Sequence, residues 1–182
     1  THSLPIEIGR ADSRHVARAG PRKLCSVPKS LFQIKPQAYI PWVLNMGPLS
    51  PKLEHSPSNM HACKAHCVKQ FMTRHGISDV DEIVRKLIPD PHILSYIYPG
   101  LQGYNSESLQ LLLTVDTIFL HEFLLFCTSL ATSEDEISGY LHSFFDSPIT
   151  RMEIWRDLVL IGNQIPMPLV NNTIREFVNR PN

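Results

Sequence analysis

A cluster of histidines and cysteines is the first feature whose residue types could do chemistry. His61, Cys63, His66 and Cys67 all lie within one short stretch of the chain. On a helix, Cys63 and Cys67 would share one face with His66 in reach, whereas His61 would point to nearly the opposite side. A tetrahedral zinc site needs convergent ligands, which proteins usually supply as two separated pairs. Because no second pair is evident, we predict ordinary helix residues, no metal site and no cofactor.

Asp116 is the second candidate, because it places a carboxylate in the most apolar stretch of the chain. An unpaired buried charge costs several kcal/mol, so this group must find a partner or take up a proton. One interpretation is a general acid or base with a raised pKa. The interpretation that we favour is a structural anchor, which pairs with Arg156 or accepts hydrogen bonds from the backbone of a loop. On a helix, its neighbours are all apolar: Leu112, Val115, Phe119, Leu120 and Phe123.

Asn163 and Gln164 are the third candidate, at the end of an apolar segment. Their amides could bond to the open carbonyl groups at the end of a helix, or they could bind a ligand. The sequence holds no glycine-rich phosphate loop, no Gly-x-Ser-x-Gly elbow and no His-Glu-x-x-His pair, so we predict no catalytic residue. The residues that we expect to be buried polar groups with structural roles are Asp116, Arg156, Asp157, Asn163 and Gln164.

The composition argues against some partners and locations. The chain has 182 residues, and its 17 basic side chains balance 17 acidic ones, which argues against capture of nucleic acid. Residues 109–131 are very apolar, but charges such as Asp116 near the centre would each cost roughly 2.5–3.5 kcal/mol in a bilayer. We therefore predict a buried core helix there. The scattered cysteines indicate free thiols in a reducing compartment such as the cytoplasm, although a secreted domain with two disulfides has the same count.

The elements that must position these residues are predicted to be helices. Residues 1–24 are basic and poor in apolar side chains, which predicts a flexible arm, and residues 25–182 form the helical domain. Prolines predict an extended segment over residues 25–52, and residues 96–104 read as a loop. The fold class is therefore all-α, an irregular multi-helix globular domain. Apolar residues at helical spacing predict helices over residues 58–74, 78–88, 106–126, 133 onward, 151–161 and 168–178.

Capping patterns set the starts of two of these helices. Ser78 with Asp81, and Ser133 with Glu136, have the spacing of a capping box, in which two side chains satisfy the free N–H groups of the first turn. At the other end of a helix, Gly76 is a suitable stop for the helix over residues 58–74.

Three segments of the chain stand in a characteristic order. The first holds Val-Pro at residues 27–28, Tyr-Ile-Pro at residues 39–41 and Gly-Pro at residues 47–48. The second is the apolar segment of residues 115–120 with its central aspartate, and the third is Asp-Leu followed by Asn-Gln-Ile-Pro within residues 156–166. Together these segments resemble the N-terminal part of a plant-specific family, domain-of-unknown-function family 247.

The resemblance implies a role without naming a chemistry. Full members of this family are much longer and usually end in one transmembrane helix, so it implies a truncated chain whose membrane anchor belongs to missing sequence. Some members are linked to self-incompatibility in grasses, which implies recognition and signalling. No catalytic residues are established for the family.

We therefore predict a non-enzymatic module that binds an unknown protein partner, and we leave its oligomeric state open. The alternative is a small-molecule-binding or hydrolytic domain that uses Asp116 with Asn163 and Gln164. A degenerate fragment with no function of its own is a third possibility.

Overall fold

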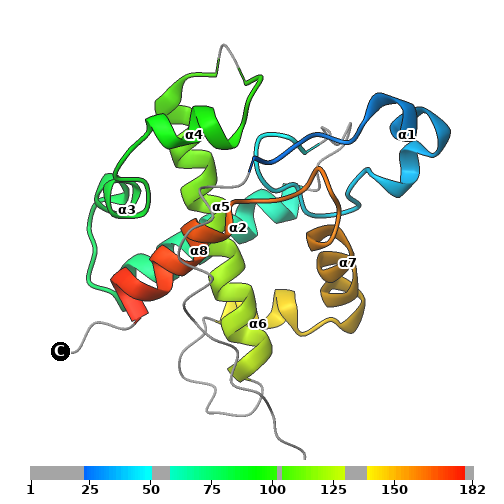
Figure 1. Cartoon of the computed structure of the whole chain (residues 1–182). Coiled ribbons are helices and arrows are strands. Elements are labelled where there is room, and N and C mark those ends of the chain that lie inside the picture. The colour runs from blue at the N-terminus through cyan, green and yellow to red at the C-terminus, as the bar shows by residue number, and fades with distance from the viewer. Residues whose placement is uncertain (1–22, 51–57, 102–103, 130–138, 179–182) are drawn as a thin grey trace, which may run out of the picture.

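The computed structural model of the chain describes residues 23–50, 58–101, 104–129 and 139–178 (Figure 1). Every regular element in these ranges is a helix, which confirms the all-α fold class. In chain order the elements are α1 (Lys29–Ile34), η2 (Pro36–Ala38), α2 (Ser58–Arg74), α3 (Val80–Leu87), α4 (His92–Ile97), α5 (Ser106–Ser129), α6 (Gly139–Phe145), α7 (Pro148–Leu158), α8 (Met167–Thr173) and the π-helical η4 (Ile174–Val178).

Helix α5 is the central element of the fold. Leucine and phenylalanine cover most of its circumference and it contains neither glycine nor proline, so the segment favours a helix that packs on several sides. It contacts α2 and α8, which cross it in Figure 1, as well as α3 and α6. Leu113, Phe119 and Phe123 are completely buried in these contacts. The core helix predicted over residues 106–126 is confirmed and extends to Ser129.

By length and composition α5 could also cross a membrane, and no other helix in the described ranges meets that test. Its most apolar window has a mean hydropathy of 1.7, and 50% of that window is buried inside the protein. Both of its central acids are ion-paired with α2, Asp116 with Lys64 and Glu122 with Arg74. A helix whose apolar window is half buried by neighbouring helices and whose two acids are ion-paired with one of them packs as a core helix.

Helix α2 coincides with the predicted range 58–74. Its buried face repeats every four residues, because Cys63, Cys67 and Phe71 are each 0% exposed and that spacing places them on one side of the helix. Gly76 follows the last turn with a φ of +62°, the left-handed conformation that commonly ends helices. The stop predicted at this glycine is confirmed.

The start of α3 differs from the prediction. Asp79 is the cap residue: its backbone is extended and its side chain accepts a hydrogen bond from the N–H of Asp81 at 2.9 Å. The capping box predicted between Ser78 and Asp81 is therefore wrong. Asp79 takes the role because it holds the extended backbone that a cap needs and its short side chain reaches back to the first turn.

Helix α7 is displaced from the predicted range 151–161 towards the N-terminus. Ser147 caps it by accepting a hydrogen bond from the Thr150 N–H, and Pro148 occupies the first turn, where a missing N–H costs nothing. At the other end the chain turns after Leu158. The actual bounds matter for the site, since they place Asp157 in the last turn of the helix.

Short helices occupy part of two segments that were predicted to be irregular. Helix α1 lies between Pro28 and Pro36, which leave room for less than two turns. The described part of the segment predicted to be extended, residues 25–50, is therefore only partly extended. Helix α4 overlaps the start of the predicted loop, because Leu94 and Ile97 fall on one face and are buried. Six residues are too few for a periodic apolar signal.

Other predictions fall partly outside the described residues. This holds for the start of the helix predicted from Ser133 and for its cap with Glu136; the described part is α6. The predicted arm, residues 1–24, lies outside up to residue 22, and the N–H of Leu24 donates to the last carbonyl of α4 at 2.8 Å. The helix predicted over residues 168–178 is α8, followed by one π-helical turn, η4.

Charged and histidine side chains meet where the end of α2 faces the middle of α5. Arg74 and Glu122 are paired at 2.6 Å, and His121 Nδ1 lies 3.2 Å from the same carboxylate. Burial alone would raise the pKa of Glu122, but the bonds from His121 and Arg74 outweigh it and hold that pKa below its usual value. His75 packs beside Phe71 with Nε2 buried and without a hydrogen bond among the described residues. Burial, aided by Arg74 and His121, lowers the pKa of His75.

We expect the domain to lose stability as the pH falls below the ordinary histidine pKa of 6.5. Because the folded pKa of His75 lies below that value, the unfolded chain takes up a proton first. The free energy of unfolding then decreases until the folded His75 is itself protonated, and Glu122 adds a second loss at lower pH. Urea unfolding of the His75→Gln variant across this range should show a flatter pH dependence. The control is His92→Gln, at the exposed start of α4; an unchanged slope in His75→Gln would contradict the assignment.

Candidate functional site

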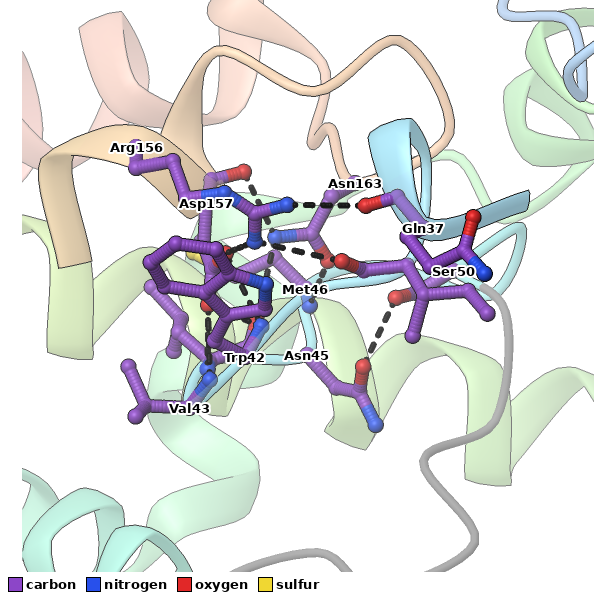
Figure 2. A network of polar contacts seen from close by, with 11 residues as sticks. Gln37, Trp42, Val43, Asn45, Met46, Ser50, Arg156, Asp157 and Asn163 are labelled. Carbon is purple, nitrogen blue, oxygen red and sulfur yellow. Dashed lines mark hydrogen bonds and ion pairs between the residues drawn. The ribbon is translucent and has the colours of Figure 1, made fainter. Parts of the chain in front are cut away.

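The polar residues singled out from the sequence lie around one loop, residues 41–49, which we call the anchored loop. Asp116 comes from the middle of α5, Arg156 and Asp157 from the last turn of α7, and Asn163 from the turn after α7. The loop is held by the middle of α5 and by the end of α7, and Figure 2 shows how side chains from distant parts of the sequence converge on its backbone. The backbone N–H and C=O groups of a buried loop must find partners, and here side chains supply them.

Asp157 binds the first part of the anchored loop. Its buried carboxylate accepts hydrogen bonds from the N–H groups of three consecutive residues, Trp42, Val43 and Leu44, at 2.8–3.0 Å. Consecutive N–H groups that point at one anion form a concave nest with a positive potential. Arg156 adds a bond to the same carboxylate at 2.7 Å, so the charge is both hydrogen-bonded and paired.

Asn163 binds the next part of the loop. Its Oδ1 accepts a hydrogen bond from the Met46 N–H at 2.6 Å, and its Nδ2 donates to the Leu44 carbonyl at 2.7 Å. Nδ2 also donates to the carbonyl of Asp157 at 2.8 Å. This amide therefore bonds an open carbonyl near the end of α7, as one of the two sequence interpretations proposed, and at the same time holds the loop (Figure 2).

Asp116 binds the last part of the loop. Its Oδ2 accepts a hydrogen bond from the Gly47 N–H at 2.7 Å, and its Oδ1 is 2.5 Å from Nζ of Lys64 on α2. Lys64 also donates to the carbonyl of Asn45. Burial raises the pKa of Asp116, while Lys64 and the Gly47 N–H oppose the rise. Of the two anchors proposed from the sequence, the loop backbone is a partner, whereas Arg156 is not.

Arg156 instead connects α7 to the segment before the loop. Its guanidinium donates to the carbonyls of Gln37 and Ile40, each at 3.1 Å. It also lies 3.9 Å above the ring of Trp42, close enough for a cation–π interaction. Arg156 is half-buried, and Figure 2 shows its side chain between the indole and the Gln37 carbonyl. The segment that leads into the loop is therefore fastened to α7.

Gln164 differs from the prediction, because its side chain is exposed. Its backbone carbonyl takes part instead. A Cβ atom added to Gly47 would lie only 2.4 Å from this carbonyl oxygen, and the Tyr98 hydroxyl donates to the same oxygen at a long 3.5 Å. Gly47 has a φ of +67°, and both its conformation and the close carbonyl require a residue without a side chain.

Sequence reasoning missed Lys64, which completes the ion pair of Asp116. It follows Cys63 on α2, at the border between the buried and exposed faces, where lysine is ordinarily solvated. No spacing rule connects Lys64 to an acid that stands 52 positions later. The Gly-Pro pair of the first segment did draw attention to Gly47, but no sequence pattern indicated that the Gln164 carbonyl lies close to it.

The histidine–cysteine cluster lies elsewhere. Cys63 and Cys67 face the core, and burial together with their mutual hydrogen bond raises the pKa of Cys67. His66 stacks on Tyr140 of α6 at 4.0 Å between ring centroids, and His61 is exposed. In the described ranges no three His, Cys, Asp or Glu side chains are grouped as metal ligands would be.

Chemically, the groups around the loop are occupied. The carboxylates of Asp116 and Asp157 accept hydrogen bonds from backbone N–H groups and from Lys64 or Arg156, and the Asn163 amide uses both of its ends. Acid or base catalysis requires such a group to reach a substrate. The arrangement is suited to holding the loop in one conformation.

The three segments that meet at the loop match a known family. A family model described as a plant protein of unknown function, DUF247, covers residues 24–181. The chain is also similar to a putative UPF0481 protein of Arabidopsis thaliana, with 28% identity over 175 residues. That match covers 94% of this chain and 30% of the relative, so the chain spans less than a third of the relative's length. No solved structure matches the chain.

We expect Gly47→Ala to destabilise the domain more than Gly76→Ala. Both glycines have positive φ, +67° and +62°, so an alanine at either position carries a similar strain of about 1–2 kcal/mol. Only at Gly47 would the new Cβ also meet a backbone carbonyl; a Cβ at Gly76 meets nothing within 4 Å. Overpacking of this kind adds about 1–3 kcal/mol. Equal losses in urea unfolding would contradict the close approach of Gln164.

We expect Asp157→Asn to cost about 3–5 kcal/mol, since it leaves Arg156 without its buried partner and turns an amide donor towards N–H groups. The amide protons of Trp42 to Leu44 should lose protection in hydrogen exchange before the rest of the domain. Asp146→Asn is the control, because the Asp146 side chain is 66% exposed and its loss should stay within about 0.5 kcal/mol. Unchanged protection of the three amides would show that Asp157 does not hold the loop.

Proposed function

Because the chain belongs to the DUF247 family of plant proteins of unknown function, we propose that it is a non-enzymatic protein-interaction module. The proposal includes a place within a longer, membrane-anchored signalling protein. Its support is the resemblance of the three segments, together with a relative of which this chain spans only 30%. The structural observation that supports it is that the buried polar side chains bind the protein's own backbone.

That observation is the occupation of the Asp116, Asp157 and Asn163 side chains by the anchored loop. The side chains of Asp116, Asp157 and Asn163 converge, as a catalytic site would require, but they converge on main-chain atoms of Trp42 to Gly47. The alternative, a hydrolytic or small-molecule site with Asp116, Asn163 and Gln164, would need this loop to leave. Departure would expose two carboxylates and break the bonds that connect α2, α5 and α7, at a cost of several kcal/mol.

The outer surface supports a binding role. Exposed large apolar side chains are normal when scattered, but several together mark interaction sites. Among the described residues, eight of the fifteen such side chains lie on α1, on Trp42 of the anchored loop, on α7 and on the turn that follows. The members of this group are Leu31, Ile34, Trp42, Ile149, Met152, Trp155, Val159 and Ile161.

We expect the full 182-residue chain to capture at least one specific protein from plant tissue extract. Immobilised chain should enrich this protein by at least about tenfold over an unrelated helical domain, which corresponds to roughly 1.4 kcal/mol of preference. Excess untagged chain should compete the capture, and purified partner should bind saturably. Quantitative mass spectrometry of the eluates is the measurement.

The contrary result is equally definite. No competed protein in the eluates, combined with turnover of a panel of ester substrates that is lost in Asp116→Asn, would replace the interaction module with the hydrolytic alternative. Asp146→Asn is the matched control for turnover, because it removes a comparable carboxylate from the surface.

A further inference from the structure

We propose that α7, together with the lysines at the two ends of α1, forms a docking surface for an amphipathic helix that carries acidic side chains along its flank. The inference rests on the proposed interaction role and adds to it the location of the surface and the chemistry of the partner. We call the surface the α7 face. Its apolar members are Ile149, Met152 and Trp155 of α7, Val159 directly after the helix, and Trp42 of the anchored loop.

The apolar stripe runs along one side of α7. Ile149, Met152, Trp155 and Val159 are spaced three or four residues apart, which places them on one face of the helix. They are 69%, 72%, 46% and 73% exposed. The stripe is about 15 Å long, from the rise of 1.5 Å per residue.

The rest of α7 is already packed. Ile154 and Asp157 on the opposite side are buried, and the helix contacts α6. A surface helix ordinarily turns polar residues outward once one side is packed. Helix α3 does so, with Glu82, Arg85 and Lys86 near its surface. Helix α7 therefore has a second apolar side, which the described residues of its own fold leave largely exposed.

Aromatic residues give the stripe fixed anchors. Trp155 packs one edge against Phe123 of α5 at 5.3 Å between ring centroids, which leaves the remainder of the indole outside. Trp42 is 59% exposed, and its ring is held by the Arg156 guanidinium. Tryptophans that are ordered before binding contribute area with little loss of conformational freedom, and they are frequent at binding hot spots.

The charge beside the stripe defines the partner. Residues 23–50 contain Lys23, Lys29 and Lys35 and no aspartate or glutamate. Lys29 and Lys35 are exposed at the two ends of α1, which projects from the same side of the molecule as α7 in Figure 1. Arg156 ties the segment just after Lys35 to α7 through the Gln37 carbonyl. An apolar stripe whose helix is tied to a segment that carries lysines complements a helix that has an apolar stripe and acidic side chains.

A helix fits this surface better than a membrane or a second copy. One narrow stripe along one helix is the shape that helix-in-groove recognition uses, with anchors at three- and four-residue spacing. Binding to anionic membranes draws on clusters of several lysines and arginines, and α1 offers two. A second copy of this chain would bring the same lysines, without an acid on residues 23–50 to face them.

The test uses the full chain and two synthetic peptides of about 18 residues. Both carry the same leucine stripe at helical spacing; one has glutamates on its flank and the other has lysines. Fluorescence anisotropy should show that the acidic peptide binds at least about tenfold more tightly. Met152→Asp combined with Val159→Asp should weaken that binding at least about tenfold. Lys29→Glu combined with Lys35→Glu should reverse the order of the two peptides.

Matched variants on other surfaces are the controls. Tyr104→Asp changes an exposed aromatic residue before α5, and Lys69→Glu changes an exposed lysine on α2. Both should leave the two affinities unchanged. Thermal melts of all variants establish that they fold; because every substituted side chain is largely exposed, the melting temperatures should shift little.

Several results would overturn the assignment. The first is that neither peptide binds, or that both bind equally well. The second is that the chain binds anionic phospholipid vesicles and that the α7 variants weaken vesicle binding but not peptide binding. The third is a dimer in sedimentation equilibrium that Met152→Asp dissociates. Failure here is distinguishable from failure of the proposed function. If extract capture persists unchanged in the α7 variants, the interaction module stands and its surface lies elsewhere.

Discussion

The hydrogen bonds that one buried carboxylate accepts from three consecutive main-chain N–H groups are the constraint on which the rest of this structure depends. A segment with prolines at positions 36, 41 and 48 cannot form a long helix, and no strand among the described residues is available to pair with it. Its main-chain N–H groups are nevertheless buried or partly buried, and a buried one left unpaired would cost about 1–3 kcal/mol. Asp157 satisfies the N–H groups of Trp42, Val43 and Leu44 at once.

The same constraint connects parts of the chain that are far apart. Asp157, Asn163 and Asp116 bind the loop in that order along its length, and each comes from a different helix or turn. The loop in turn packs Leu44 and Met46 into the core. Because one loop bonds to several elements, a slip of any one of them would break hydrogen bonds to the others. We infer that these polar contacts fix the arrangement of the helices more than they add to net stability.

The sequence predicted those parts of the structure that depend on local patterns. Helices α2 and α5 follow from long apolar repeats, and Asp116 stood out because its helical neighbours are all apolar. Local patterns could not reveal that Lys64 pairs with Asp116, since that ion pair depends on how α2 crosses α5. They also misplaced Gln164. Its residue type indicated a role for the side-chain amide, whereas the fold uses its backbone carbonyl, a group that every residue has. Helix α4 was missed because six residues are too few to show a periodic apolar pattern. The cap of α3 was assigned to Ser78 in place of its neighbour Asp79, because both residue types are common caps.

The anchored loop also sets the outer surface. Trp42 is the residue whose N–H meets Asp157 inside, and its ring stands outside under the Arg156 guanidinium. Arg156 and Asp157 are neighbours on α7, so the inward bond and the outward stack share one turn of helix. Any partner that presses on the indole therefore acts on a ring whose backbone is already fixed, and ordering it on binding costs little further entropy. In the proposed docking surface, the buried carboxylate would contribute to recognition by fixing the backbone of an exposed tryptophan, without touching the partner.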